Sequence, residues 1–544
     1  MRPVRNYSIA TLVVLAVGTL AGGFFGGQVD ADSDKPEDQF WTFGRVLALV
    51  EDEFVGETDS KDLVNNAIRG MLQQLDPHSN YLDEEAFAEM RDEQRGKFSG
   101  LGIQINKRGP DYPLTIIAPI DGTPADRAGL RSGDVISEIN GEPTLELTVN
   151  GAVRRLKGPK GTSVTITIDR PGPTEPFEVT IERDDIPVES IRVAHMLDGD
   201  VGLIRVANFT STTANELDKA ILRLREQGMT KLLLDLRGNP GGLLDQAVQV
   251  AERFIPSGKL IVYTRGRIRG SKADYVAKRA VERWEQPLVL LVDGSSASAS
   301  EIVAGAVQDH DRGLIVGKTT FGKGLVQRVI PLQQGGGALA VTTAKYFTPK
   351  GRLIQRDYSD FEQYYMTRSD VGVGVGEDGE VTPDPDNQEV FLTESGRKMY
   401  GGGGIRPDYI VENPDPPVLI YRLFRENLLF DFSVRYASEH EDLERGFEID
   451  EAILEGFRDF LATRDFEYKA AEYEEAVEFF SVRIKAQIGR LRWGAEEESR
   501  ILAESDPQVQ QALKVFGEAA ELHGRVLRLG ESDEDLLAEV DESQ

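Results

Sequence analysis

An uninterrupted apolar run at residues 288–292 constrains the fold of this chain more than any other stretch. It ends at Asp293-Gly294, and a cluster of small residues follows at 295–300. A short apolar run without alternation is typical of a strand that is buried on both faces of a parallel sheet. Apolar residues at helical spacing come next, so the segment predicts a strand, a tight turn that carries serines, and a helix. A second apolar run at 314–316 leads into a glycine-rich loop that contains Lys323. The pattern indicates an α/β fold.

The turn between the predicted strand and helix is a favourable place for a nucleophilic serine. The first amides of a helix lack partners within the helix and, together with the helix dipole, can stabilise an oxyanion. A serine hydroxyl also needs a base, and the histidines are scattered along the chain: His78, His195, His310, His440 and His523. A lysine can act as the base where burial lowers its pKa. Lys323, between Phe321-Gly322 and Gly324, fits a partly desolvated lysine close to backbone.

The sequences SASASEI (296–302) and TFGKGLVQ (320–327) resemble the active-site region of the C-terminal processing peptidases, also called tail-specific proteases. The resemblance implies that Ser298 is the nucleophile and Lys323 the general base. It also implies that Gln327 orients the lysine. Ser-Lys pairs are a recognised variant of the serine-protease triad.

DLRGNPGG at residues 235–242 is a further phrase that is similar to the family. By the same resemblance, the amide of Ala299 and that of Gly241 or Gly242 form the oxyanion hole, since glycines at a strand end let amides approach a substrate closely. The sequence leaves the choice between the two glycines open. The resemblance also implies a crotonase- or ClpP-like α/β protease core with an inserted PDZ domain, and no metal or cofactor.

Simpler interpretations of the same residues remain open. Ser298 and Glu301 have the S-x-x-E spacing of a helix capping box, a role that is compatible with catalysis. A lysine on a glycine loop is often only a solvated side chain. The segment GLIVGKT at 313–319 lacks the spacing of a Walker loop, because Arg312 stands where a glycine is required, so nucleotide binding is not expected.

Composition limits the range of functions. The length of 544 residues suggests about three or four domains. The chain has 92 acidic and 62 basic residues, and its net charge of −30 argues against nucleic-acid binding. Cysteine is absent from the sequence, which excludes disulfides, thiolate catalysis and cysteine-based zinc sites.

The N-terminus predicts export. Arg2 and Arg5 precede an apolar stretch from about Ile9 to Phe25, which is typical of a secretory signal peptide or of an N-terminal membrane anchor. Residues 1–34 are assigned to this stretch and its polar spacer. We therefore expect a cell-envelope protein, periplasmic or otherwise extracytoplasmic, that is secreted or anchored by this segment.

Two regions are expected before the protease core. Residues 35–95 have helical periodicity, and His78 in LDPHSNYL is interpreted as a turn residue. Residues 96–186 resemble a PDZ domain through GLGI, AGLRSGD and INGE, with FSGLGIQI (98–105) as the first strand. In PDZ domains a peptide adds a strand to a sheet edge, and backbone amides hold its terminal carboxylate. The resemblance assigns this role to the loop and strand at Gly100, Leu101, Gly102 and Ile103.

The protease core is predicted at 187–415, and an acidic helical domain at 416–544. Its helices are expected near residues 417–438, 449–463, 466–495, 496–504 and 507–529. Residues 356–403 form an insert that is longer than the family's usual link, and a plain surface loop is expected there.

Together these patterns predict a serine endopeptidase that recognises proteins by their C-terminal tails through a PDZ domain, in C-terminal processing or quality-control proteolysis in the cell envelope. Its expected partners are proteins or peptides with free C-terminal tails. A second copy of the chain, bound through the helical regions, and an adaptor protein are further candidates. The main alternative is a membrane-tethered, non-catalytic PDZ scaffold that binds protein C-termini, and a third hypothesis is a crotonase-like acyl hydrolase. The presence of Ser298, Lys323 and Gln327 favours the peptidase.

Overall fold

The structure is a computed structural model that describes residues 36–541, except 108, 110–111, 171–174, 198, 279–281, 334–335, 360–363, 365–372, 376–380 and 384–388. The predicted signal or anchor segment, residues 1–34, lies outside the described residues. Of the helices that are described, none is both long and apolar enough to cross a membrane. The chain divides into two compact units, residues 1–75 and 76–544.

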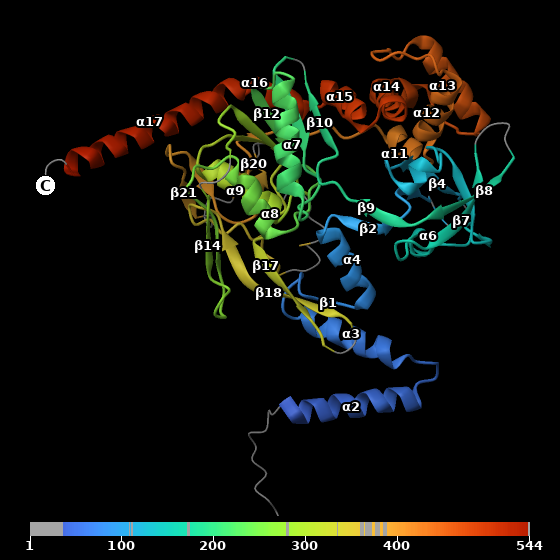
Figure 1. Cartoon of the computed structure of the whole chain (residues 1–544), viewed down its shortest axis with the longest axis horizontal. Helices are drawn as coiled ribbons and strands as arrows, with labels where there is room; N and C mark the ends of the chain where they lie inside the picture. Colours follow the sequence, from blue (N-terminus) through green and yellow to red (C-terminus); the bar gives the residue numbers. More distant parts are fainter. Residues whose placement is uncertain are drawn as a thin grey trace, which may run out of the picture. The chain divides into compact units, whose positions relative to one another are not determined.

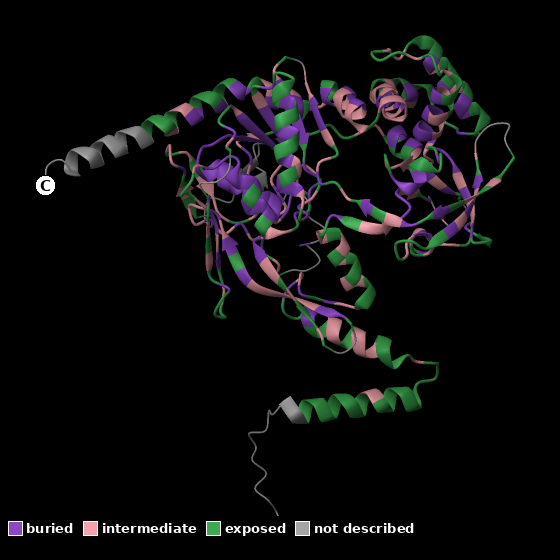
Figure 2. Cartoon of the chain, viewed as in Figure 1, coloured by how far each residue is buried: buried purple, intermediate pink, exposed green. Residues whose placement is uncertain are grey.

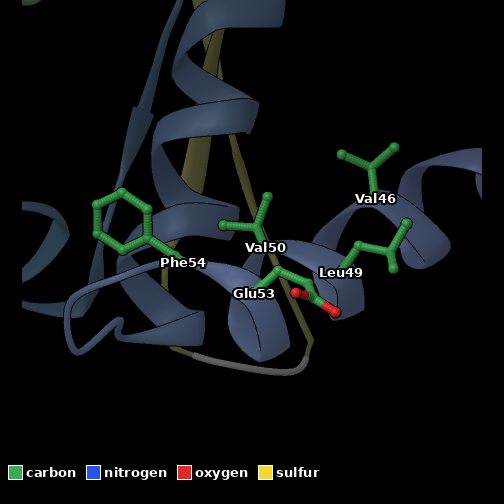
Figure 3. A pocket seen from close by; sticks show the side chains of 5 residues that line it. All are labelled: Val46, Leu49, Val50, Glu53 and Phe54. Carbon is green, nitrogen blue, oxygen red and sulfur yellow. The ribbon is translucent and has the colours of Figure 1, made fainter.

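The first unit contains two helices, α2 (Pro36–Glu53) and α3 (Ser60–Gln73). Asp59 caps α3 by accepting hydrogen bonds from the amides of Lys61 and Asp62, which satisfies donors that the helix leaves free. Helix α2 is exposed along nearly its whole length (Figure 2). Its exposed side chains include several large apolar ones, and Figure 3 shows Val46, Leu49, Val50 and Phe54 lining an open hollow on it.

The centre of the second unit is a six-stranded sheet in the order β10-β11-β12-β15-β16-β23. Figure 1 labels two of its strands, β10 and β12. The strands are β10 (Val193–Met196), β11 (Val201–Arg205), β12 (Lys231–Asp235), β15 (Leu288–Val292), β16 (Leu314–Gly317) and β23 (Tyr409–Ile410). β10 is antiparallel to β11, and the other neighbours are parallel, with Leu234 of β12 opposite Leu290 of β15. The predicted α/β core is confirmed.

Helices cover both faces of this sheet, which is why its strands read as continuous apolar runs. Leu234 and the other side chains on the same face of the sheet pack on α7 (Thr213–Glu226), α8 (Leu244–Glu252) and α9 (Ala299–Asp309). Leu233, on the opposite face because side chains alternate along a strand, packs on residues from three C-terminal helices. These are α15 (Ala495–Ser505), α16 (Pro507–Lys514) and α17 (Phe516–Asp541). The boundary predicted between 415 and 416 therefore separates residues that share one hydrophobic core.

A second sheet contains β17, the strand that directly follows the lysine loop. Its order is β1-β18-β13-β14, and β17 pairs with β18. The strands are β1 (Asn80–Leu82), β13 (Leu260–Arg265), β14 (Ala273–Val276), β17 (Leu325–Pro331) and β18 (Ala338–Phe347). β1 interrupts the region expected to be helical, and α4 (Glu84–Gln94) follows it. β17 begins two residues after Lys323 and carries Gln327.

The PDZ-like region is a sheet in the order β3-β4-β5-β7-β8, with β6 paired to β5. Its elements are β3 (Ile103–Asn106), β4 (Leu114–Pro119), α5 (Pro124–Arg127), β5 (Val135–Ile139), β6 (Glu142–Pro143), α6 (Val149–Leu156), β7 (Ser163–Asp169) and β8 (Phe177–Glu182). The prediction of one continuous strand at 98–105 is wrong, because Leu101 and Gly102 interrupt it and separate two strands. The residues before the break form β2 (Lys97–Gly100), which pairs with β9 (Asp184–Pro187) instead.

Four helices form a separate core: α11 (Val418–Arg425), α12 (Leu428–Glu439), α13 (Glu451–Thr463) and α14 (Ala470–Trp493). The prediction of a single helix at 417–438 is wrong, because the segment forms two helices, α11 and α12. Asn427 separates them with a left-handed backbone conformation, φ 55°. Asparagine tolerates this conformation better than most residues.

The insert at 356–403 contains short strand pairs and is anchored to the protease core. The strands are β19 (Val373–Val375), β20 (Val381–Pro383), β21 (Val390–Leu392) and β22 (Lys398–Tyr400). Glu394 accepts a hydrogen bond from Lys259 (3.0 Å) and pairs with His310 (2.9 Å), and Arg397 bridges Asp311 and Asp408. The expectation of a plain surface loop is wrong for residues 389–403.

Candidate active site

Ser298 lies on the turn between β15 and α9, where the sequence places it. Its backbone has φ 55° and ψ −109°, an unusual conformation for a residue other than glycine. Such strain persists only where the surroundings enforce it, and it is frequent at functional sites. Here α9 is buried over its entire length (Figure 2), and the Tyr346 hydroxyl donates a 3.1 Å hydrogen bond to the Ser298 carbonyl. The turn is thus held rigidly.

Lys323 lies on a loop whose conformation favours glycine at position 322. Gly322 has φ 85°, and a Cβ added to it would come within 3.0 Å of the Gly404 amide nitrogen. The Lys323 Nζ donates a 3.2 Å hydrogen bond to Gln327 Oε1. Within the described residues it donates none to the Ser298 hydroxyl. Burial lowers the pKa of the Lys323 ammonium, while the carboxylates of Glu301 and Asp76 oppose this shift.

The fully buried carboxylate of Glu301 joins the serine turn to the lysine loop. Its Oε2 accepts from the amides of Ser298 (2.7 Å) and Lys323 (2.9 Å), so the two backbones meet at one oxygen. Its Oε1 accepts from the Thr320 hydroxyl (2.6 Å) and the Gly322 amide (2.7 Å). Burial raises the pKa of Glu301, and these four donors oppose the rise. The capping interaction anticipated for Ser298 and Glu301 is present, and it extends to the proposed base.

Gln327 is held by a turn that precedes β1. The Gln327 side-chain amide donates to the carbonyl of His78. Asp76 fixes this turn by accepting from the amides of His78 and Ser79 (both 2.8 Å) and from the Thr342 hydroxyl (3.1 Å). Burial would raise the pKa of Asp76, but these hydrogen bonds and one from the Ser79 hydroxyl lower it. His78 is a turn residue, as expected, but its carbonyl also belongs to the site.

The DLRGNPGG loop is joined to the serine turn through Asn239. The Asn239 carbonyl accepts from the Ala297 amide (3.0 Å) and the Ser300 hydroxyl (3.0 Å). A Cβ added to Gly241 would lie 2.8 Å from Ser298 Cβ and 3.0 Å from the Ala299 nitrogen, so both candidate oxyanion elements adjoin the serine. The Gly241 amide donates to Asn239 Oδ1 (2.9 Å). Within the described residues no hydrogen bond engages the amides of Gly242 and Ala299.

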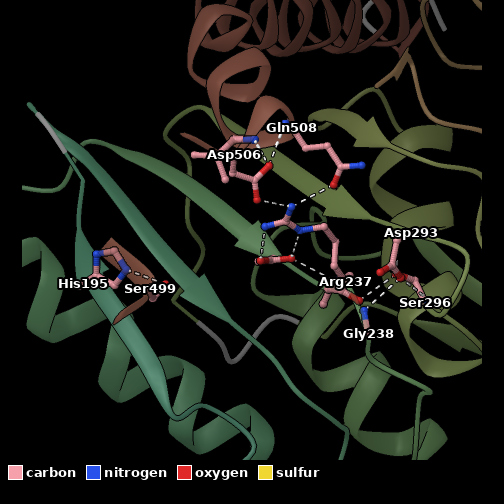
Figure 4. A network of polar contacts seen from close by, with 11 residues as sticks. His195, Arg237, Gly238, Asp293, Ser296, Ser499, Asp506 and Gln508 are labelled. Atoms are coloured by element: carbon pink, nitrogen blue, oxygen red, sulfur yellow. Dashed lines mark hydrogen bonds and ion pairs between the residues drawn. The ribbon is translucent and has the colours of Figure 1, made fainter. Parts of the chain in front are cut away.

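An ion-pair network connects the same loop to the C-terminal helices. The Arg237 guanidinium pairs with Asp235 (2.9 Å) on one side. On the other it contacts Asp506 (2.7 Å) and Gln508 (2.9 Å) at the start of α16, as Figure 4 shows. Asp293, which Figure 4 shows beside Ser296, accepts from the Gly238 amide at 3.0 Å. The candidate oxyanion loop is therefore tied both to the serine turn and to helices that are distant in sequence.

The four predicted tail-binding residues lie where β2 ends and the PDZ-like sheet begins. Among the described residues, strand β3, which begins at Ile103, pairs with β4 on one edge and with no strand on the other. Gly100 ends β2. Gly102 has φ 82°, and a Cβ there would lie 2.3 Å from the Thr123 hydroxyl. In the described part of the chain, no hydrogen bond engages the amides of Leu101 and Gly102.

The structure thus brings six predicted residues into one site: Ser298, Lys323, Gln327, Ala299, Gly241 and Gly242. Sequence patterns missed the positioning roles of Asp76, His78 and Asn239, and gave Glu301 only as a cap. The spacing of Asp76 and Ser79 could have indicated a side-chain-stabilised turn. Among the described residues, no group of three or more histidine, aspartate or glutamate side chains is placed to hold a metal ion.

Comparison with protein-family models gives four matches along the chain. Residues 200–360 match peptidase family S41, and residues 115–170 match a PDZ domain. Residues 27–86 match the N-terminal domain of the activating protease CtpB. Residues 419–488 match the C-terminal helical domain of a group of PDZ-proteases. The matched regions follow the order of the regions predicted from the sequence.

Similar whole proteins carry related names. The chain is 44% identical over 321 residues to the carboxy-terminal-processing protease of Bartonella bacilliformis, covering 58% of this chain and 73% of that protein. It is 36% identical to the carboxy-terminal processing protease CtpA of Bacillus subtilis over 64% of this chain and 72% of that protein. Among solved structures, the photosystem II D1 C-terminal processing protease matches 69% of this chain and 88% of its own, with 27% identity and a TM-score of 0.34.

Proposed function

The chain belongs to peptidase family S41, the serine-type carboxy-terminal-processing proteases with a PDZ domain, and on that premise we propose that Ser298, Lys323 and Gln327 are its catalytic residues. The observation that carries this assignment is the shared Glu301 oxygen, which holds the amides of Ser298 and Lys323 together. The lowered pKa of the Lys323 ammonium makes the neutral amine available as a base.

The reaction follows from these positions. Neutral Lys323 takes the proton of the Ser298 hydroxyl, and the serine oxygen attacks the scissile carbonyl carbon. The tetrahedral intermediate collapses, the Lys323 ammonium gives its proton to the leaving amine, and an acyl-enzyme remains. Water, deprotonated by the same amine, attacks the ester, and the proton returns to the Ser298 oxygen as the acid leaves. The hydrogen bond from Lys323 Nζ to Gln327 Oε1 orients the amine, and the lone pair of the neutral amine accepts the serine proton once substrate binding aligns the two groups.

For the oxyanion hole we propose the amides of Ala299 and Gly242. Ala299 is the first residue of α9, where helix amides lack partners. The Gly241 amide is already satisfied by Asn239, whereas that of Gly242 is available within the described residues. The role of Gly241 is then steric, since its hydrogen leaves room beside Ser298.

The PDZ domain of this chain is proposed to capture substrate tails through Gly100, Leu101, Gly102 and Ile103. The open edge of β3 can pair with an extended peptide, and the unengaged amides of Leu101 and Gly102 can hold its terminal carboxylate. The substrates would be proteins with free C-terminal tails, in processing or quality control. Arg2, Arg5 and the apolar stretch after them support a proposed place in the cell envelope, secreted or anchored.

We also propose that the exposed apolar face of α2 binds a second copy of the chain. Phe40 is 74% and Trp41 81% exposed, and large apolar groups gathered on one surface mark protein contacts. Light scattering of the full chain should give a mass of at least two copies, and Leu49→Asp should lower it. An unchanged mass would instead favour another partner, such as an adaptor protein.

The test of the catalytic assignment compares Ser298→Ala with Ser295→Ala, an exposed serine on the same turn. The assay is cleavage of an unfolded protein with an apolar C-terminal tail by the purified full chain. Ser298→Ala and Lys323→Ala should abolish cleavage, and Ser295→Ala should keep it. Full activity of Ser298→Ala would refute the assignment, and tail binding without cleavage by the wild type would support the non-catalytic scaffold.

A further inference from the structure

Tyr364, from the insert at 356–403, lies buried against the turn that holds Gln327. Its side chain is 2% exposed. The Tyr364 hydroxyl is 2.7 Å from His78 Nε2, and its ring meets the His78 ring edge-on with the centroids 5.6 Å apart. No sequence pattern marked this residue, because the insert departs from the family's usual length.

Further residues hold the Tyr364 ring in place, among them Tyr358, which meets it edge-on with the centroids 6.2 Å apart. Phe321, two residues before Lys323, meets it edge-on with the centroids 5.5 Å apart. The Arg356 guanidinium lies over both rings, 4.6 Å from the Phe321 centroid and 4.8 Å from the Tyr364 centroid. Arg356 also donates to the Tyr364 carbonyl at 2.8 Å, and its own amide donates to the Gly322 carbonyl at 2.9 Å. The tyrosine is therefore fixed to the lysine loop itself.

These contacts form a continuous path to the proposed base. The Tyr364 hydroxyl forms a hydrogen bond with the His78 ring. The His78 carbonyl accepts a hydrogen bond from the Gln327 side-chain amide, and Gln327 Oε1 accepts one from Lys323 Nζ. Asp76 fixes the other end of the same turn through the His78 and Ser79 amides. His78 is thus held on two sides, by Asp76 at its backbone and by Tyr364 at its ring.

We propose that Tyr364 is a positioning residue for catalysis, which holds the His78 turn so that Gln327 can orient Lys323, and which, packed on Phe321, shields the lysine loop from water. The proposal rests on the catalytic roles assigned to Lys323 and Gln327. Tyr364 acts through His78 and is not itself one of the reacting groups. Tyr364 and Arg356 of the insert then supply part of the support of the active site.

The charged groups around Lys323 set the expected direction of the pH effect. Glu301 and Asp76 raise the pKa of Lys323, and burial lowers it more. His78 stays neutral near neutral pH, since burial and the nearby Lys323 lower its pKa to about 4. Removing the Tyr364 ring leaves these charges in place and admits water, so the pKa of Lys323 should rise.

Two variants distinguish the role of the hydroxyl from that of the ring. Tyr364→Phe keeps the ring contacts and removes the 2.7 Å hydrogen bond to His78, together with a long 3.5 Å contact from Gln355 Nε2. For this variant kcat should fall about three- to tenfold with KM unchanged, as expected for one neutral hydrogen bond. Tyr364→Ala should lower kcat further and move the rising limb of the pH–rate profile to higher pH, while Tyr364→Phe leaves that limb in place. Tyr400→Phe, on β22 of the same insert, is the matched control and should behave as wild type.

The measurements use the full chain, with rates divided by the concentration of active sites that a serine-reactive phosphonate titrates. The double variant His78→Ala/Tyr364→Phe should have the same kcat as the less active of the two single variants. Both substitutions remove the hydrogen bond between His78 and Tyr364, so their effects should not add. Unchanged rates and an unchanged limb in Tyr364→Ala would overturn the proposal. So would additive losses in the double variant, which would mean that Tyr364 does not act through His78. Retained activity in Lys323→Ala would instead refute the assigned base, on which the proposal depends.

Discussion

The most informative single substitution is Glu301→Gln, which keeps the size of the side chain and removes its charge. The carboxylate accepts four hydrogen bonds of 2.6 to 2.9 Å, two on each oxygen. A glutamine has only one oxygen, so it can serve the pair from Ser298 and Lys323 or the pair from Thr320 and Gly322, but not both.

The size of the effect follows from the number of hydrogen-bond donors left without an acceptor. Two of the four donors lose their acceptor, and each unmade buried hydrogen bond costs about 1–3 kcal/mol, so the free energy of unfolding should fall by about 2–6 kcal/mol. The catalytic efficiency should fall as well. If about half of this free energy is lost from the alignment of Ser298 and Lys323, kcat/KM falls by roughly one to two orders of magnitude.

The pH dependence of the variant has a defined sign. The base acts as the neutral amine, so activity rises as pH passes upward through the pKa of Lys323. The Glu301 charge raises that pKa, so its removal should lower it. The limb of the pH–rate profile therefore moves to lower pH while the plateau falls.

The assay is cleavage of a tailed, unfolded protein from about pH 6 to about pH 10, with rates divided by active-site concentration and stability measured by denaturant unfolding. The control is Glu439→Gln, where an exposed glutamate pairs with Arg435 on α12 and should change stability by less than about 1 kcal/mol. If Glu301→Gln keeps the wild-type plateau and limb, the carboxylate does not organise the site and the reasoning fails.

Three further predictions use matched positions. Leu522→Ala (2% exposed), in the core shared by α17 and the sheet, should cost about 2–5 kcal/mol in denaturant unfolding, whereas Leu527→Ala (50% exposed) should stay within about 0.5 kcal/mol; equal losses would contradict the shared core. Gly102→Ala should weaken binding of a C-terminal peptide in calorimetry far more than Gly129→Ala, which shares the positive φ but meets no neighbouring atom within 4 Å; equal affinities would argue against the proposed carboxylate loop. The wild-type rate should rise with one pKa that lies below the ordinary value of lysine, about 10.4, as burial of Lys323 requires; a rate that rises only at or above that value would contradict a buried lysine base.

Local patterns predicted the part of the site that is continuous in sequence. The strand expected at 288–292 coincides with β15, and the serine turn and helix follow it as predicted. Such a segment is readable because both its burial and its turn are encoded within a few neighbouring residues. The family resemblance then supplied the lysine and glutamine.

Contacts between distant segments could not be predicted in the same way. The role of Glu301 depends on a loop some twenty residues away, and that of His78 on residue 327. Tyr364 lies in an insert whose pattern indicated only turns. The apolar faces of α16 and α17 were visible as helical periodicity, but periodicity does not say which surface covers them. Tertiary packing decided that they cover the sheet.

The most direct test of the account is labelling by a fluorophosphonate, which reacts covalently with an activated serine. Mass spectrometry of the digested full chain should locate the label on Ser298. The labelling rate in Lys323→Ala should be lower by about two to four orders of magnitude, the usual contribution of a general base. A label on another residue, or an unchanged rate without Lys323, would contradict the claim that these two side chains form the catalytic pair.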